Sequence, residues 1–501
     1  MNISMLLDMA ADAFGERTAV VCGGRSLTYA EVRQKAQRAA VKLRESGVEY
    51  LALLDVNGPV LPVAIFAAGY AGIPYVPLNY RLTREEINAL LERVAPALLV
   101  VGDEFRAQVD KRDDLLMISS DEFINAPATA FEEEFVDPES VAVQLFTSGT
   151  TGKPKAALLR HENLVSYIVG TVEFGAAAEE DAVLVTVPPY HIAGISAVLS
   201  STYACRRMVQ LENFEATAWL KAAQDEMVTN AFVVPTMLGR IIESMENSRE
   251  TVELPRLKAL AYGGGKMPRA TIERAMQLMP QVDFTNAYGL TETSSTVAVL
   301  TPDDHRLAMA SDDEAVRKRI ASVGKATGAV EIEIRDEQGQ TVAAQQPGMI
   351  FVRGGQVSGE YKEQGSTLSE DGWFCTKDLG YLDEDGYLFL EGREDDVIVR
   401  GGENISPGEI EDVLISHPAV ADVACVAIAD EQWGEAVAAA VVLQSGASVS
   451  VEDLQALVRE RLRSSRVPQR IEFRDELPYN ELGKVLRRVI RQDFASLVEA
   501  A

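Results

Sequence analysis

The stretch Thr147-Ser-Gly-Thr-Thr-Gly-Lys-Pro-Lys155 holds residue types suited to phosphate chemistry. It follows an apolar run, residues 141–146, that is typical of a buried strand. Its glycines and proline interrupt regular structure, so a loop with hydroxyls, N–H groups and lysines is predicted. Such groups donate hydrogen bonds to phosphate and neutralise its charge. Only two residues separate Gly149 from Gly152, where a Walker loop has four before its Gly-Lys. The pattern therefore predicts a phosphate-binding loop of another kind.

Six further motifs follow this loop along the chain. They are Pro188-Pro-Tyr-His191, Ala287-Tyr-Gly-Leu-Thr-Glu292, Thr376-Lys-Asp378, Gly392-Arg-Glu-Asp395, Gly401-Gly-Glu-Asn404 and Asn480-Glu-Leu-Gly-Lys484. Together, in this order and over about residues 10–490, they resemble the signatures of the adenylate-forming superfamily. That superfamily contains acyl-CoA synthetases, aryl-CoA ligases, luciferases and peptide-synthetase adenylation domains. The chain is most similar to the acyl- and aryl-CoA ligases.

The resemblance implies a two-step reaction with ATP, Mg²⁺ and CoA. A carboxylate attacks the α-phosphorus of ATP and expels pyrophosphate, and a thiol then attacks the acyl carbon and expels AMP. Because the first step brings an anion up to a polyanion, catalysis depends on positioning and charge neutralisation. The residues that the resemblance assigns to ATP or AMP are Thr147, Ser148, Gly149, Thr150, Thr151, Gly152, Lys155, Asn286, Ala287, Tyr288, Asp378 and Arg393.

The resemblance also assigns the catalytic groups. Lys484 is expected to bridge the substrate carboxylate and the α-phosphate, and Thr291 to contact that phosphate. Glu292 is expected to hold Mg²⁺, a hard cation that prefers carboxylate, water and phosphate oxygens. His191 is expected to open the acid site when AMP forms. An isolated histidine on an apolar segment is more often a core residue, and an isolated lysine in a tail is usually solvated.

The second step involves other residues. Asp395 is expected to be a hinge about which the C-terminal domain presents first Lys484 and then a thiol-binding loop. That loop and the CoA nucleotide are assigned to Gly401, Gly402, Asn404 and Arg466. Glycines at 401 and 402 let a pantetheine arm pass close to the backbone.

The acid pocket is expected to be apolar. By resemblance it is drawn from residues 191–195, 232–238, 263–265 and 297–299, with His191, Ile192, Gly194, Ile195, Val233, Gly263, Gly264, Gly265 and Val297 as lining residues. Ile192 cannot pair with an ammonium group, and burying an unpaired ammonium is costly, so an amino-acid substrate is disfavoured. Glycines 263–265 leave width for a ring or a bulky alicyclic acid at least as readily as for a slim fatty chain.

Several positions depart from the family pattern. Lys377 and Ala156 stand where glycine is usual, Arg160 where threonine or serine is usual, and Ser465 where an aromatic residue is common. The last departure leaves Arg466 as the cation expected at the CoA nucleotide. Three alternatives stay open: transfer to a carrier-protein pantetheine, an inactive ATP-binding protein of the same fold, and a luciferase-like oxygenase.

Composition and net charge limit the kinds of partner and the cellular location that we expect. The 501 residues carry a net charge of −29, which argues against nucleic acid or an anionic membrane as the main partner. The four cysteines are widely separated and no secretory signal is apparent, so a cytoplasmic location without disulfides or a zinc site is expected. A homodimer is one assembly state that the sequence leaves open.

The segments between these motifs predict an α/β and α+β multidomain protein. An amphipathic helix is expected over 28–46 and buried strands at 51–54, 98–101 and 182–187, an alternation that favours parallel sheets. An antiparallel subdomain should begin near Val330. We predict an N-terminal domain over 1–392, a hinge at 393–395 and a mobile α+β domain over 396–501. Residues 56–80 lack charge, but their prolines and glycines predict a short helix and a strand instead of a membrane span.

Overall fold

The computed structural model describes residues 1–127, 130–147, 154–248, 252–328, 330–430, 432–480 and 484–499. The chain divides into two compact units, one of residues 1–332 and 352–374 and one of residues 333–351 and 375–501. The division passes through three strands of one antiparallel sheet, β16 (Val330–Arg335), β17 (Gly348–Gly354) and β20 (Phe374–Leu382). The predicted hinge at 393–395 concerns motion, which one arrangement does not test, and it stays a prediction.

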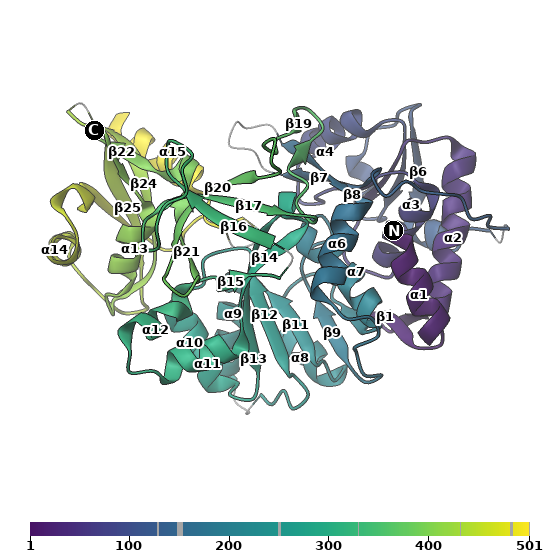
Figure 1. Ribbon diagram of the computed structural model, residues 1–501, viewed down its shortest axis with the longest axis horizontal. Helices are drawn as coiled ribbons and strands as arrows, with labels where there is room; N and C mark the ends of the chain where they lie inside the picture. Colours follow the sequence, from purple (N-terminus) through teal and green to yellow (C-terminus); the bar gives the residue numbers. More distant parts are fainter. Residues whose placement is uncertain are drawn as a thin grey trace. The chain divides into compact units, whose positions relative to one another are not determined.

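The first unit contains two mixed sheets (Figure 1). One has the strand order β15-β14-β13-β12-β11-β9-β10-β1-β2 within the described residues. These strands are β1 (Thr18–Cys22), β2 (Arg25–Thr28), β9 (Ala182–Val185), β10 (Arg207–Gln210), β11 (Asn230–Val233), β12 (Ala259–Gly263), β13 (Asp283–Leu290), β14 (Ser295–Leu300) and β15 (Lys325–Ala326). From β1 to β13 the neighbouring strands run parallel, which confirms the predicted parallel pairing.

The other sheet of this unit has the order β19-β18-β8-β7-β4-β3-β5-β6 in the part of the chain that is described. Its strands are β3 (Tyr50–Leu54), β4 (Tyr75–Pro77), β5 (Ala97–Val101), β6 (Leu115–Ser119), β7 (Val141–Thr147), β8 (Lys155–Arg160), β18 (Glu360–Tyr361) and β19 (Gly365–Ser366). The strands β7, β4, β3, β5 and β6 are parallel, whereas β8 turns back antiparallel to β7.

The helices of the first unit connect and cover these strands. They are α1 (Ser4–Phe14), α2 (Tyr29–Ser46), α3 (Val60–Ala71), α4 (Arg84–Leu91), α5 (Ser120–Ile124), α6 (His161–Thr171), α7 (Ile192–Ala204), α8 (Ala216–Asp225), α9 (Pro235–Asn247), α10 (Arg269–Leu278), α11 (Pro302–Ala310) and α12 (Glu314–Lys318). The helix predicted over 28–46 is confirmed as α2, and Thr28 caps it by accepting a hydrogen bond from the Glu31 N–H.

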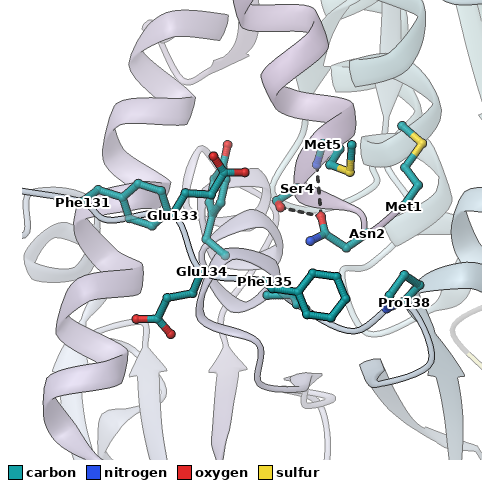
Figure 2. Close-up of a pocket in the computed structure, with 11 residues that line it drawn as sticks. Met1, Asn2, Ser4, Met5, Phe131, Glu133, Glu134, Phe135 and Pro138 are labelled. Atoms are coloured by element: carbon teal, nitrogen blue, oxygen red, sulfur yellow. Dashed lines mark hydrogen bonds between the residues drawn. The ribbon is translucent and has the colours of Figure 1, made fainter.

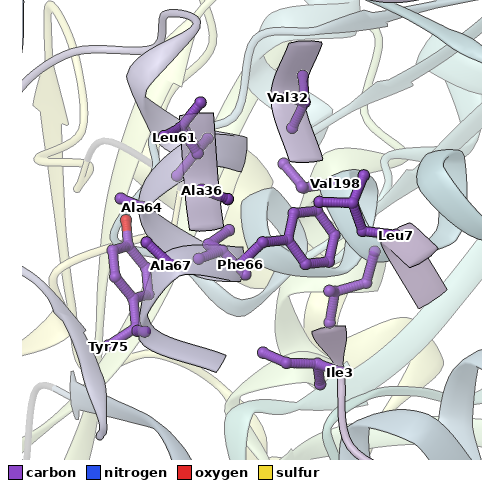
Figure 3. Close-up of a cluster of buried hydrophobic side chains, with 14 of the residues drawn as sticks. Ile3, Leu7, Val32, Ala36, Leu61, Ala64, Phe66, Ala67, Tyr75 and Val198 are labelled. Atoms are coloured by element: carbon purple, nitrogen blue, oxygen red, sulfur yellow. The ribbon is translucent and has the colours of Figure 1, made fainter. Parts of the chain in front are cut away.

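The core under α1, α2 and α3 is built from small and large apolar side chains that interlock. Figure 3 shows Phe66 of α3 among Leu7 of α1, Val32 and Ala36 of α2, and Val198 of α7, all buried. The alanines of α2 let α3 approach closely, and α3 is buried along all of its length but its last residue. This explains why residues 56–80 lack charge: α3 is a core helix of 12 residues, about 18 Å long, far short of a bilayer. No described helix has the length and apolar character to cross a membrane.

The second unit holds an antiparallel ladder and a small α+β part. Strand β20 pairs antiparallel with β21 (Leu388–Arg393). The C-terminal sheet has the order β23-β22-β25-β24, with β26 (Arg470–Arg474) against β25; its other strands are β22 (Ile398–Arg400), β23 (Glu403–Ile405), β24 (Val420–Asp430) and β25 (Gly434–Leu443). Its helices are α13 (Pro407–Ile415), α14 (Val451–Arg461) and α15 (Arg487–Glu499). The fold class predicted from the sequence is confirmed.

Candidate active site

Four of the predicted site segments lie at one edge of the first sheet. The parallel strands β9, β11, β12 and β13 are neighbours. Their carboxyl ends lead to His191, Val233, Gly263 and Glu292 respectively. Ligands of parallel sheets bind beyond the carboxyl ends of the strands, and this topology places the predicted acid-binding and ATP-binding segments at that edge of the sheet.

The phosphate loop is flanked by two strands that pair with each other. Strands β7 and β8 pair so that Thr147 and Lys155 stand opposite each other, and the Thr147 hydroxyl lies 3.5 Å from the Lys155 carbonyl oxygen. The two ends of the loop are therefore fixed by the ladder. The predicted residues Ser148, Gly149, Thr150, Thr151 and Gly152 lie outside the described residues.

The carboxylate of Glu292 is held by a segment that sequence reasoning missed. Glu292 sits in a short 3₁₀ turn after β13, with 8% of its surface exposed. The Tyr361 hydroxyl donates to its Oε1 at 2.5 Å. The N–H groups of Ser358 and Gly359 donate to its main-chain oxygen at 2.9 and 3.2 Å. Because Tyr361 lies 69 residues further along the chain, no local pattern could have predicted this contact.

Lys155 completes this cluster. Its Nζ lies 5.4 Å from the centroid of the Tyr361 ring, within the range of a cation–π contact. A cation and a carboxylate therefore lie against the same tyrosine. No group of three or more His, Cys, Asp or Glu side chains that could hold a metal occurs among the described residues. One buried carboxylate fits Mg²⁺, which takes most of its ligands from water and substrate phosphates.

The adenine segment lies on β13. The Asn286 amide donates to the Ser322 carbonyl oxygen at 3.1 Å and is buried, and Tyr288 is also buried. Ala287 pairs with Gly263 of β12, and a Cβ on Gly263 would lie 2.2 Å from the Ala287 oxygen. Close approach of two strands therefore requires glycine at 263. Gly264 and Gly265 beyond it are exposed, and Gly264 has a φ of +80°.

The histidine of the acid segment is desolvated. His191 caps the N-terminus of α7, and its ring lies 4.6 Å from that of Tyr190. Burial, helped by the positive charge of Arg81, lowers the pKa of His191 to about 3, so the ring is neutral at pH 7. Gly194 follows where a Cβ would lie 2.8 Å from the Pro188 carbonyl oxygen.

The remaining predicted lining residues differ in exposure. Ile195, Val233 and Val297 have no exposed surface, whereas Ile192 keeps some. A hollow of about 140 Å³ near the N-terminus is lined by other residues, including Met5, Phe131 and Phe135 (Figure 2). None of the predicted acid-site residues lines it.

In the second unit, the predicted ribose carboxylate faces a guanidinium group. Asp378 and Arg393 are partners across the β20–β21 ladder, and Arg393 Nε lies 3.1 Å from Asp378 Oδ1. Lys377, where the family commonly has glycine, has a φ of +61°. That is the left-handed region, which glycine adopts without strain, so the backbone explains the family preference.

Lys484 lies in the same unit and near the same charges. Two hydrogen bonds with Asn480 hold its main chain: the Lys484 N–H donates to Asn480 Oδ1 at 2.8 Å, and the Lys484 carbonyl oxygen accepts from the Asn480 N–H at 2.9 Å. Desolvation lowers the pKa of Lys484, and the positive charge of Arg393 lowers it further, whereas the carboxylates of Asp378 and Asp396 oppose the change. Lys484 thus lies in one compact unit with the Asp378–Arg393 ion pair, although the segments are about a hundred residues apart, and both charges of the pair act on the pKa of the lysine.

The predicted CoA loop has the backbone that its glycines permit. Gly401 and Gly402 have φ values of +58° and +83°, and a Cβ on Gly401 would lie 2.7 Å from the Trp433 ring. Asn404 lies in β23 opposite Val399 of β22. Arg466 contacts Glu403 and lies 3.3 Å from Glu409 Oε2, so two carboxylates already neutralise it.

The hinge segment is a short 3₁₀ turn. Asp395 lies in its middle, over Glu394–Asp396, and its carbonyl oxygen accepts a hydrogen bond from Arg491 Nη2 at 3.2 Å.

Known protein families match this chain over most of its length. Residues 7–362 match the AMP-binding enzyme family and residues 409–484 match the AMP-binding enzyme C-terminal domain. The 2-succinylbenzoate–CoA ligase of Bacillus cereus is 33% identical over 95% of both chains. The indoleacetate–CoA ligase of Aromatoleum aromaticum is 30% identical over 98% of both chains.

A solved relative shows the same architecture. The o-succinylbenzoate CoA synthetase MenE of Bacillus subtilis, in complex with the acyl-adenylate intermediate OSB-AMP, superposes with a TM-score of 0.81, 28% identity and coverage of 97% of each chain. Its complex with ATP and a magnesium ion gives a TM-score of 0.79 at 29% identity, over 96% of this chain and 98% of that one. The resemblance inferred from the motifs is confirmed, and the chain belongs to the AMP-binding enzyme family.

Proposed function

We propose that this chain activates a bulky, hydrophobic monocarboxylic acid with ATP and transfers the acyl group to CoA. The observation that supports the proposal is that one compact unit contains Lys484 together with the Asp378–Arg393 ion pair. The predicted class, an AMP-forming acid–thiol ligase that uses ATP, Mg²⁺ and CoA, is confirmed by the family and its ligase relatives. The acid and the roles of single residues are the parts that we propose.

In the first step, an oxygen of the substrate carboxylate bonds to the α-phosphorus while the bond from that phosphorus to the bridging oxygen breaks. Lys484 places its ammonium between these two anions and lowers their repulsion. Asp378 accepts hydrogen bonds from the ribose hydroxyls, and Arg393 holds that carboxylate in place. Thr147 and Lys155 bind the outer phosphates, and Thr291 contacts the α-phosphate. Mg²⁺ would be held by Glu292 and would supply neutralising charge on the phosphates.

In the second step, the thiol sulfur bonds to the acyl carbon, AMP leaves with the electron pair of the mixed anhydride, and the thiol proton passes to solvent. Gly401 and Gly402 leave room for the pantetheine arm beside the backbone. We propose that domain motion about Asp395 exchanges Lys484 for this loop between the steps.

The four predicted acid-binding segments contain no Lys, Arg, Asp or Glu. Their histidine, His191, is neutral at pH 7. A second carboxylate on the acid would lack a cation there, and burying it would be costly. We therefore propose a monocarboxylate with a ring, closer to indoleacetate than to the dicarboxylate 2-succinylbenzoate.

A pyrophosphate-release assay with both acids, a fatty acid and an alicyclic acid tests this proposal. We expect release with indoleacetate or the alicyclic acid, and thioester formation only when CoA is added. Preference for 2-succinylbenzoate would contradict the proposed pocket. Thioester formation on carrier protein but not on CoA would favour the carrier-loading alternative. A cytoplasmic location and a homodimer stay predictions, which fractionation and light scattering test.

A further inference from the structure

A buried ion pair lies three residues beyond Lys484. Arg487, the first residue of α15, places Nη1 at 2.5 Å from Glu411 Oε1 and Nη2 at 3.0 Å from Oε2. The two side chains are only 20% and 11% exposed. This two-pronged geometry is specific to arginine and fixes direction as well as distance.

The pair is tied to the sheet below it. Glu411 of α13 accepts the Cys425 N–H at 2.7 Å, and Arg487 donates to the Cys425 carbonyl oxygen at 2.8 Å. Main-chain groups of β24 thus satisfy both side chains, and the start of α15 is fixed to α13 and β24 together. Replacing a buried ion pair by apolar residues often costs no stability, so the presence of this pair does not show that it stabilises the fold. Its directed contacts instead suggest that it fixes the position of the start of α15.

The segment that carries Lys484 is anchored on both sides. Before it, the Tyr479 hydroxyl donates to Asp422 of β24, and Tyr479 bridges to Val485. After it, the Leu486 N–H donates to the Pro478 carbonyl oxygen at 2.8 Å. These contacts hold the main chain on both sides of Lys484, and the long lysine side chain starts from that main chain.

We propose that the Arg487–Glu411 pair positions Lys484 for the adenylation step. The pair acts through the main chain between Lys484 and Arg487 and does not touch substrate. Arg487 also adds positive charge near Lys484, in the direction that lowers the pKa of the lysine, with Asp396 at 3.5 Å from Arg487 Nε as the opposing charge. This inference rests on the proposed function, because Lys484 matters only if acid adenylation is the reaction.

The test compares two conservative variants with a matched control in the full-length protein. Arg487→Lys keeps the charge and loses the fork, and Glu411→Gln keeps the shape and loses the charge. The control is Arg474→Lys, because Arg474 of β26 pairs with Asp493 of the same helix at 2.6 Å and is also mostly buried. Single-turnover assays measure adenylation from acid and ATP, and thioester formation from preformed acyl-adenylate.

We expect Arg487→Lys and Glu411→Gln to slow adenylation by about 10–10²-fold, because a displacement of about 1 Å can cost 10²-fold. The rate of thioester formation in the same samples should stay within about twofold of wild type, because these substitutions do not alter the groups used in that step. Arg474→Lys should leave both steps near wild type. Added to Lys484→Ala, Arg487→Lys should have no further effect, because residues that act as a unit are not additive.

Unchanged adenylation, an equal loss in both steps, or the same imbalance in Arg474→Lys would overturn the inference. A further slowing on the Lys484→Ala background would show that Arg487 acts by another route and would also overturn it. A readout that is independent of turnover is the rate at which acetic anhydride labels Lys484 relative to Lys362. We expect this ratio to change in Arg487→Lys and not in Arg474→Lys. If wild-type protein releases no pyrophosphate with any acid, the proposed function has failed instead.

Discussion

Glu292 and Lys484 are the two charged groups that the reaction is expected to depend on, and the protein positions them differently. Glu292 is buried in the first unit, and a neighbouring tyrosine hydroxyl holds its carboxylate directly. Lys484 lies in the second unit, and the described contacts around it hold its main chain. A metal-binding carboxylate must present fixed oxygens. A lysine that enters for one step and leaves for the next, as we propose for Lys484, needs a main chain that is held in place. Direct and indirect positioning therefore suit the two roles.

The comparison predicts the largest loss at Lys484. We expect Lys484→Ala to slow adenylation by about 10²–10³-fold, the usual effect of removing one preorganised charge donor. Thioester formation from preformed acyl-adenylate should be largely spared, because the lysine neutralises charge only in the first step. Single-turnover measurements of each half-reaction check this, and equal losses in both would contradict the assigned role.

A change at the buried carboxylate should be nearly as severe. Glu292→Gln removes the charge that would hold Mg²⁺, and we expect adenylation to fall by about 10²-fold with a higher magnesium requirement. Tyr361→Phe is the milder partner variant: it removes one hydrogen bond to a charged group, so a loss of about tenfold is expected. Magnesium titrations of pyrophosphate release measure both. An unchanged magnesium requirement in Glu292→Gln would exclude Glu292 as the metal ligand.

Restricting the predicted hinge at Asp395 should affect the two half-reactions differently. Asp395→Pro fixes φ near −65°, and it should block the pose used for thioester formation while adenylation survives. We expect thioester formation to fall by about tenfold or more, with Asp395→Ala as the control that keeps φ free. Wild-type rates in both half-reactions would show that Asp395 is no hinge.

The acceptor prediction is smaller. Two carboxylates neutralise Arg466, so it offers little charge to the 3′-phosphate of CoA. An exposed ion pair is worth about 0–1 kcal/mol, and dephospho-CoA should therefore raise KM only a few-fold. Comparing kcat/KM for CoA, dephospho-CoA and a carrier protein tests this. A hundredfold penalty for dephospho-CoA would require cationic contacts beyond Arg466.

The smallest effect concerns backbone strain beside Asp378. A non-glycine residue in the left-handed region costs about 1–2 kcal/mol. Glycine avoids this cost, but it raises the conformational entropy of the unfolded chain, which offsets part of the gain in stability. Lys377→Gly should therefore raise the free energy of unfolding by about 0.5–1 kcal/mol. Lys377→Ala removes the same exposed side chain but keeps the Cβ, and it should not stabilise. Thermal and urea unfolding distinguish the two, and equal stabilities would mean that the conformation carries no strain.

Short stretches of sequence were sufficient to predict the features that depend on neighbouring residues. The amphipathic pattern over residues 28–46 predicts a helix, which the structure contains as α2. The uncharged stretch around α3 was correctly assigned to a helix and a strand, because prolines and glycines punctuate it. The order of the motifs indicated the family, since each occupies a loop or strand end whose chemistry depends on few adjacent residues.

Tertiary structure alone decided which residues hold the reactive groups. Tyr361 reaches Glu292 over 69 positions, and Arg487 reaches Glu411 over 76. The sequence around Tyr361 or Arg487 contains no sign of either partner, because a hydrogen bond between distant segments depends on how strands and helices pack. The sequence thus determined the fold family and the expected reactive side chains, and three-dimensional packing determined how each of them is positioned.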